Sequence, residues 1–373
     1  MIVALLFLCG TLLHSGESDS NTGWAPPALI VQIGQFSVYT AYGLLLVCFV
    51  LILFQRNFRF YGGGYFQVGM AYVFLLAIAV AHTDDLVRYL VLAITSICIP
   101  QVLLKLQKRK GHEEVILDGM QAWALMYTLI SVSGFLINDA PSGRLSGYMT
   151  NPNSFGFSMV VALLVNLFIG RYSFAKKTVI GLVEFYLIHA TGSRLSVLAA
   201  AIVVMYWIVA RARSSKAGFA PLVFFAITVC IYLLIFQNPS EGDRGLQFAS
   251  AFSDSGRDIL YQQAIQGIAR NPILGYGMTA HELILGTGNV HSSFLRLGFM
   301  IGLPLAAVFF LFYAYGLFSV YKMSAKGSML RPFVMVIPLF FVGEDYIVGV
   351  GSFFYFVFLA MMGLSIRAPA EMN

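Results

Sequence analysis

Four polar segments of this sequence combine arginine or histidine with turn-forming residues, and these segments hold the side chains best suited to chemistry. They are Gly143-Arg144 with Asn151–Asn153, Thr191–Arg194, Asp254–Asp258 and His291–Arg296. The planar guanidinium of arginine binds two phosphate oxygens at once. An imidazole accepts a proton from a hydroxyl group at neutral pH. The pattern therefore predicts a site for a phosphorylated group in which a histidine acts as the base.

Each candidate also has a structural interpretation. Arg144 precedes a turn that predicts a helix starting at Asn153 or Ser154, which favours an anion site, but a solvated loop arginine has the same pattern. Arg194 begins a helix at membrane depth, where an unpaired charged group is energetically costly, and this favours a functional role. The alternative is an arginine whose charged end extends to the lipid–water interface. Arg257 would equally pair with an acidic neighbour. A lone histidine is usually structural, but His291 ends a long loop and is followed by Arg296 about one helical turn later.

The composition excludes a soluble protein. The chain has 373 residues, of which 59% are hydrophobic and 11% charged, and its mean hydropathy is +0.80. Long apolar runs separated by a few polar residues predict a helical bundle in lipid. The basic balance does not indicate nucleic acid, because the cations fall in short loops between these runs. The four cysteines lie inside apolar runs without paired spacing, which excludes a disulfide framework or a cysteine metal site.

The apolar runs predict an all-α polytopic membrane protein with about twelve transmembrane helices in a single domain, residues 1–373. The predicted spans are Met1–Leu13, Leu29–Leu53, Gly62–Ala81, Leu86–Leu104, Val115–Ile137, Ser154–Gly170, Val179–Ala190, Leu195–Ala210, Phe219–Phe236, Ser293–Tyr321, Pro332–Val342 and Ile347–Ile366.

The distribution of cations between the loops predicts the orientation. Alternate loops carry most of the arginines and every lysine, so the positive-inside rule places them and both termini in the cytoplasm. On the opposite side the cations are all arginines: Arg88, Arg144, Arg194, Arg244, Arg257, Arg270 and Arg296. That side also has the long loop Gln237–Ser292.

Within the long loop, residues 257–269 have a helical pattern typical of a helix lying on the membrane surface. The predicted apolar face consists of Ile259, Leu260, Ala264, Ile265 and Ile268.

Carboxylates are the remaining candidates. Glu344 and Asp345 form a pair between the last two predicted spans, suited to orienting a base or a sugar, although such a pair is more often a solvated turn. With Asn153 and Arg296 they are candidate supporting residues. Glu184, which lies in a short apolar span, makes a weaker case for a proton or ion path. No spacing of His, Asp or Glu predicts a metal site.

These motifs resemble the O-antigen ligase and polysaccharide polymerase superfamily of bacterial inner-membrane glycosyltransferases. The resemblance covers about the last two thirds of the chain. Besides the four segments above, it is carried by residues 271–277, with the sequence Asn-Pro-Ile-Leu-Gly-Tyr-Gly, and by Gly298 and Gly302. It implies a GT-C-like fold in the inner membrane, with the active site at the periplasmic face.

The resemblance implies a glycan donor carried on undecaprenyl pyrophosphate and an inverting transfer without metal or other cofactor. The pyrophosphate-binding arginines of the family would fall on Arg144 and Arg194, with Arg257 a less certain third, and its essential histidine on His291. The acceptor would be a lipid-linked glycan or a lipid A-core. Membrane lipids and a regulator of chain length are further candidate partners.

Two activities and one different class of protein remain open. A polymerase joins repeat units of O-antigen, capsule or exopolysaccharide and is favoured, because polymerases are the more numerous and diverse group. A ligase joins finished polymer to lipid A-core. A secondary transporter is a more distant alternative, because the long loop occurs once, late in the chain, and no internal symmetry is seen.

Overall fold

The structure is a computed structural model of the chain. It describes residues 64–80, 86–107, 112–137, 144–147, 151–169, 172–212, 257–277, 290–324, 328–344 and 357–361, with scattered residues between 32 and 54. Two of the predicted spans, Met1–Leu13 and Phe219–Phe236, lie outside these residues. Of Leu29–Leu53 and Ile347–Ile366 only a few residues are described, and Gly62–Ala81 and Ser154–Gly170 lack only residues at their ends.

Every regular element in the described part of the chain is a helix, which confirms the predicted all-α class. The helices are α3 (Gly64–Val80), α4 (Leu86–Gln107), α5 (His112–Ile137), α6 (Pro152–Phe168), α7 (Phe174–Ala190), α8 (Arg194–Ala212), α10 (Arg257–Arg270), α12 (Ser293–Met323) and α13 (Leu330–Gly343). Each fully described predicted span lies within one of these helices, although α7 begins five residues before the predicted start at Val179.

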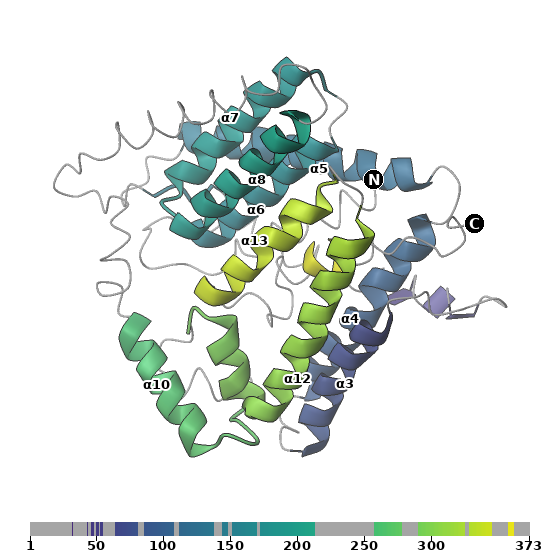
Figure 1. Ribbon diagram of the computed structural model, residues 1–373, viewed down its shortest axis with the longest axis vertical. Coiled ribbons are helices and arrows are strands. Elements are labelled where there is room, and N and C mark those ends of the chain that lie inside the picture. Colours follow the sequence, from purple (N-terminus) through teal and green to yellow (C-terminus); the bar gives the residue numbers. More distant parts are fainter. Residues whose placement is uncertain are drawn as a thin grey trace.

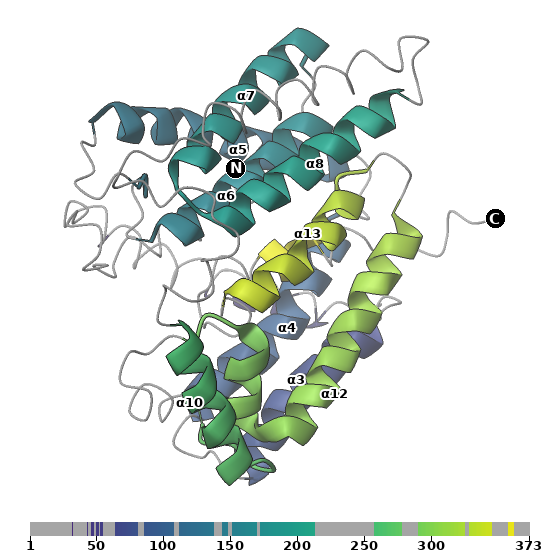
Figure 2. The ribbon, with the colours of Figure 1, turned by 60° about the vertical axis from the view of Figure 1, so that its left-hand side comes forward.

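The helices form two groups with α13 between them (Figures 1 and 2). In the first group α6 packs against α5, α7 and α8, and in the second α12 packs against α3 and α10. Helix α13 contacts α8 from the first group and α12 from the second. It therefore joins the two halves, and the residue that follows it lies where the groups meet.

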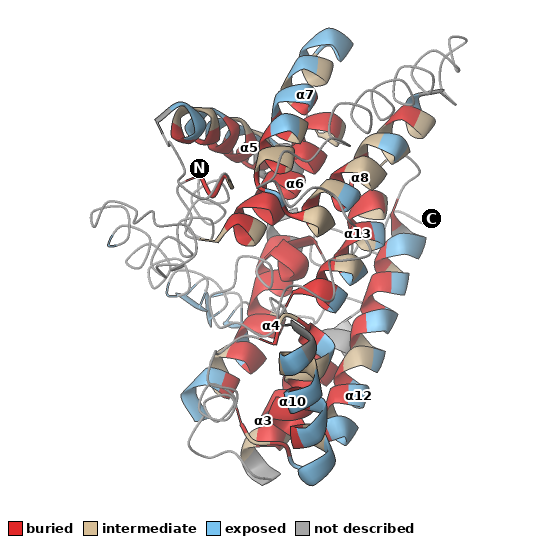
Figure 3. Cartoon of the chain, turned by 90° about the vertical axis from the view of Figure 1, so that its left-hand side faces the viewer, coloured by how far each residue is buried: buried red, intermediate tan, exposed pale blue. Residues whose placement is uncertain are grey.

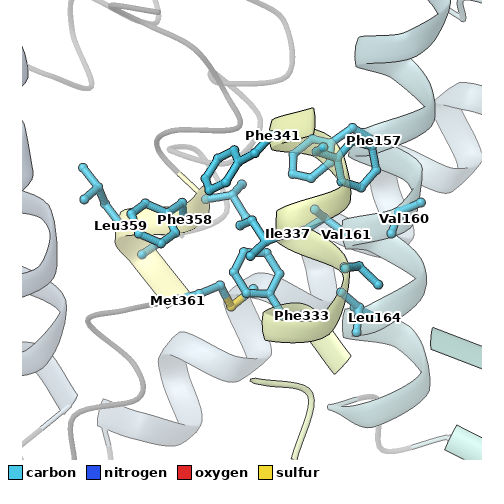
Figure 4. Close-up of a cluster of buried hydrophobic side chains, with 14 of the residues drawn as sticks. Phe157, Val160, Val161, Leu164, Phe333, Ile337, Phe341, Phe358, Leu359 and Met361 are labelled. Carbon is cyan, nitrogen blue, oxygen red and sulfur yellow. The ribbon is translucent and has the colours of Figure 1, made fainter. Parts of the chain in front are cut away.

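The core around α13 is made of aromatic and branched side chains (Figure 4). Phe157 of α6 meets Phe340 of α13 edge to face, with ring centroids 4.7 Å apart. On the other side Phe341 packs against Tyr313 of α12 at 4.2 Å. Such pairs add to the stabilisation from burial and fix the rotation of α13 about its axis.

The outward faces of the helices are exposed (Figure 3). Many of the side chains exposed there are large and apolar, as expected of an integral membrane protein. On α7, for example, Val179, Leu182 and Tyr186 are exposed, whereas Glu184 is buried. Three helical segments of the described residues are long and apolar enough to cross a membrane, namely Leu86–Leu103, Arg194–Arg211 and Ser293–Lys322, although the last is interrupted at Gly302. The exposed apolar faces indicate lipid as their surroundings.

Helix α12 differs from the predicted single span Ser293–Tyr321. Its backbone leaves the helical region at Gly302, which has φ 77° and ψ 161°. The rings of Phe294 and Phe310, before and after the break, stack with centroids 4.3 Å apart. In a straight helix these residues would be separated by about 24 Å, at 1.5 Å per residue. Residues 293–301 therefore form a short limb that folds back along the long limb, residues 303–323 (Figure 2).

The predicted apolar face of α10 is only partly free for a membrane surface. Ala264 is buried, and together with Phe299 of the short limb it forms a small cluster against which Ile268 packs. Ile259 and Ile265 are exposed. The helix was predicted correctly, but a large part of its apolar face packs against α12, because the break at Gly302 brings the short limb beside it.

Candidate functional site

Glu344 is the centre of a polar network between the two helix groups. It directly follows α13, and its side chain is 3% exposed. One carboxylate oxygen accepts a hydrogen bond from Asn153 Nδ2 at 2.8 Å, and the other lies 3.3 Å from His291 Nδ1. With the carboxylate ionised, Nδ1 carries the hydrogen and donates it, which leaves Nε2 of His291 as the proton acceptor.

The backbone of Glu344 is bound to the start of α12. Its carbonyl accepts two hydrogen bonds from Ser293, from the backbone N–H at 3.0 Å and from the hydroxyl at 2.7 Å. Ser293 is the first residue of α12, so one of the N–H groups that a helix start leaves unsatisfied finds its partner here.

Asn153 links Glu344 to Arg144. Its side-chain oxygen accepts a hydrogen bond from Arg144 Nη2 at 3.0 Å, while its nitrogen donates to Glu344. The prediction that α6 begins at Asn153 or Ser154 was wrong. Asn151 is the N-cap, and its side chain accepts from the backbone N–H groups of Asn153 and Ser154. Proline is favoured at the first helical position, so Pro152 was the signal for the earlier start.

Arg144 is fixed by a second contact, to the turn between α7 and α8. Its Nε donates to the carbonyl of Thr191 at 2.9 Å, a carbonyl at the end of α7 that has no partner within the helix. Gly192 follows with φ +63°, and a Cβ added there would lie 3.1 Å from Arg144 Nε. Glycine at this position therefore lets the guanidinium lie directly against the turn.

Arg194 begins α8 beside the same network. The neighbouring Leu195 packs against Gly343, where an added Cβ would lie 2.0 Å from Leu195 Cδ1. Gly343 is the residue before Glu344, and Thr191, which binds Arg144, is three residues before Arg194. The start of α8 thus lies between the Arg144 contact and the end of α13, with Arg194 half-buried.

His291 approaches Glu344 from the start of the short limb. It is half-buried, with its side chain 25% exposed, and its φ is 48°, in the left-handed region. Ser292 then adopts an extended conformation as the N-cap of α12. Arg296 lies one turn into the helix, where its N–H donates to the carbonyl of Ser292 at 2.9 Å.

Residues 271–277 secure the break in α12 that brings His291 to this place. The N–H groups of Tyr276 and Gly277 donate to the carbonyls of Phe299 and Met300, each at 2.9 Å, and Leu303 N–H donates to the carbonyl of Pro272 at 2.8 Å. These bonds satisfy backbone groups that the two helix ends leave without a partner. The motif at residues 271–277 therefore caps both limbs of α12, at the end of the short limb and the start of the long limb.

The structure brings four of the predicted site residues into one hydrogen-bonded series: Arg144, Asn153, Glu344 and His291. The alternative that Glu344 belongs to a solvated turn does not hold, because its side chain is buried. Arg257 is the first residue of α10, and its side chain lies outside the described part of the structure, as does Asp345.

Three residues of this region were not predicted from the sequence: Thr191 and Ser293, which bind Arg144 and Glu344, and Tyr261. Tyr261 of α10 donates from its hydroxyl to the carbonyl of His291 at 3.2 Å. No local signal marks Tyr261, because the contact depends on the packing of α10 against the short limb.

The network combines a cation, a buried carboxylate and an imidazole without any grouping suited to a metal. Among the residues that the structure describes, no three side chains of His, Cys, Asp or Glu come together. A carboxylate that holds one imidazole nitrogen leaves the other able to take a proton, and guanidinium groups nearby stabilise negative charge. The arrangement can therefore remove a proton from a hydroxyl group next to an anionic leaving group.

Comparison with known families agrees with the resemblance seen in the sequence. Residues 178–310 match the family model described as O-antigen ligase. The match covers less than half of the chain, from α7 to Phe310 of α12, and contains Arg194, His291 and Arg296. A search of curated proteins finds no match. The family match confirms the resemblance to the O-antigen ligase and polymerase superfamily, and it supports an activity of this general type.

Proposed function

We propose that this protein is an inverting membrane glycosyltransferase that moves a glycan from undecaprenyl pyrophosphate to a sugar hydroxyl. The observation that carries the proposal is the contact of His291 Nδ1 with the buried carboxylate of Glu344. It is the arrangement that an imidazole base needs, and Asn153 connects it to Arg144. The match of residues 178–310 to the O-antigen ligase family supports the same class of reaction.

In the proposed reaction the acceptor hydroxyl oxygen attacks the anomeric carbon of the donor glycan. Its proton passes to Nε2 of His291 as the new C–O bond forms. The bond between the anomeric carbon and the phosphate oxygen breaks, and undecaprenyl pyrophosphate leaves with the electron pair. Arg144 and Arg194, with Arg257 as a third candidate, stabilise the charge on the leaving pyrophosphate. A single direct displacement inverts the anomeric centre.

The preferred activity is polymerisation of O-antigen, capsule or exopolysaccharide repeat units. The second candidate is ligation of finished polymer to lipid A-core. This activity is favoured by the description of the matched family as O-antigen ligase. Deletion of the gene separates them. Cells that accumulate single repeat units support polymerisation, and cells that accumulate long chains on the lipid carrier support ligation.

The proposed location is the inner membrane of a bacterium, with both termini cytoplasmic and the site at the periplasmic face. Single cysteines introduced near the network and in the lysine-bearing loops test this in intact spheroplasts. A membrane-impermeant maleimide is expected to label only the cysteines near the network. Labelling of the lysine-bearing loops instead would reverse the orientation.

The test of the activity uses the full chain in nanodiscs with a synthetic undecaprenyl pyrophosphate-linked repeat unit and EDTA. A ladder of products on a gel is expected for the wild type. His291→Asn should abolish it, because asparagine tolerates a left-handed backbone but cannot serve as the base. Arg270→Ala is the matched control, since Arg270 is exposed at the far end of α10. A ladder from His291→Asn equal to that of the wild type would remove His291 from the reaction.

A further inference from the structure

His291 has a backbone conformation that only its surroundings can maintain. Its φ of 48° makes it the one described residue other than glycine with a positive φ. Side chains with a Cβ adopt this region rarely, and when they do, neighbouring contacts hold them there. The direction of the imidazole depends on this conformation, because the backbone sets where the Cα–Cβ bond points.

Contacts on both sides of His291 hold its backbone. On the side of α10, the hydroxyl of Tyr261 donates to the carbonyl of His291 at 3.2 Å. The preceding Val290 is buried in the cluster that α10 and the short limb of α12 share. On the other side, Ser293 is bonded through its N–H and its hydroxyl to the carbonyl of Glu344.

The helix that carries Tyr261 is itself anchored to the short limb. Gly267 of α10 lies so close to Phe299 that an added Cβ would be 2.3 Å from its ring. Tyr276 stacks on the same ring with centroids 4.8 Å apart, and its hydroxyl donates to the carbonyl of Gly267 at 3.2 Å. The Tyr261 hydroxyl is therefore held at a fixed place relative to His291.

We propose that Tyr261 is a positioning residue for the transfer reaction, and this rests on the proposed function. Through the His291 carbonyl it keeps the left-handed backbone in place, so that Nδ1 meets Glu344 and Nε2 faces the acceptor hydroxyl. Tyr261 takes no proton itself, since its hydroxyl is directed at the backbone of His291. Helix α10 thus holds His291, the proposed base, in position.

The kinetic test is Tyr261→Phe, which removes only the hydroxyl. We expect kcat to fall about 2- to 10-fold, the effect of one hydrogen bond of typical net strength, with KM for the lipid-linked donor unchanged. Tyr315→Phe is the matched control, because it also removes only a hydroxyl, from an exposed tyrosine on the long limb of α12 that takes no part in anchoring α10. An equal fall in kcat for both variants, or none for Tyr261→Phe, would overturn the proposal.

Two further measurements separate positioning from general stability and from the proposed function. In the His291→Asn variant, adding Tyr261→Phe should lower no further any trace of product that remains. Labelling of His291 by diethyl pyrocarbonate, followed by peptide mass spectrometry, should change in rate in Tyr261→Phe, while His189 labels as in the wild type. If Tyr261→Phe changes the labelling rate of His291 but the wild type makes no glycan product, the positioning role is retained and the glycosyltransferase activity is rejected. An unchanged rate would reject the positioning.

Discussion

Replacement of Glu344 by glutamine tests the network at its centre. Glutamine has nearly the same shape, and its oxygen can still accept from Asn153 Nδ2, the 2.8 Å contact of the native side chain. Its nitrogen would then face His291 Nδ1, which lies 3.3 Å from the native carboxylate. A donor at that place makes Nδ1 an acceptor, so the hydrogen of the ring moves to Nε2. In that tautomer His291 cannot take the proton of the acceptor hydroxyl.

The size of the effect follows from what is lost. A hydrogen bond to a charged group contributes about 1.5–3 kcal/mol, or about a 10- to 150-fold change in rate at about 1.4 kcal/mol per factor of ten. Loss of a general base altogether costs about 10²- to 10⁴-fold. We therefore expect kcat of Glu344→Gln to fall by about two orders of magnitude or more. The free energy of unfolding should change by less than about 1 kcal/mol, because neutralising a buried carboxylate also removes its desolvation cost.

The assay is the initial rate of ladder formation in nanodiscs, with the melting temperature of each variant measured alongside. Glu344→Ala serves as the comparison, since it also leaves Asn153 without this acceptor and should lower the melting temperature further. A Glu344→Gln variant that keeps half of the wild-type rate would refute the idea that Glu344 sets the tautomer of His291. A large fall in melting temperature for Glu344→Gln would show that the carboxylate is chiefly structural.

Three further substitutions follow from the structure. Gly192→Ala places a Cβ 3.1 Å from Arg144 Nε at a φ of +63°. We therefore expect Arg144 to bind the lipid-linked glycan donor more weakly, which raises the KM for that donor. An unchanged KM would show that the position of Arg144 does not matter. Gly302→Ala puts a Cβ 2.1 Å from a backbone carbonyl oxygen at a φ of +77°. It should lower the melting temperature and the yield of folded protein. Wild-type values of both would mean that the reversal between the two limbs of α12 does not need glycine. Arg194→Lys keeps the charge but loses the paired N–H donors, so its ladder should be strongly reduced; a wild-type ladder would show that Arg194 does not bind pyrophosphate through both donors.

The helices were predictable from the sequence because each apolar run carries its own signal of length and hydropathy. The ends of α4 and α8 lie within a few residues of the predicted ends. The break in α12 was not predicted, since hydropathy is continuous through Gly302 and only glycines and a proline mark the position. A reversal depends on partners for the freed backbone groups, and those partners come from residues 271–277, earlier in the chain.

The sequence predicted which residue types the candidate site contains better than which of its residues contact one another. Arg144 and His291 were identified because a guanidinium and an imidazole outside the lysine-rich loops need a reason to be there. That Glu344 is buried between them was not predictable, because its neighbours come from α6 and α12, and no local pattern encodes such contacts. The same is true of Tyr261, whose role depends on how α10 packs.

The contact between Asn153 and Glu344 joins residues 191 positions apart in the chain. At a synthesis rate of about 5–20 residues per second, the ribosome reaches Glu344 some 10 to 40 s after Asn153. Throughout that interval Arg144 and Asn153 have been synthesised, but the carboxylate that accepts a hydrogen bond from Asn153 Nδ2 has not. The network is therefore completed only after nearly the whole chain has been made, and a product that ends before Glu344 lacks the contact that joins α6 to the end of α13.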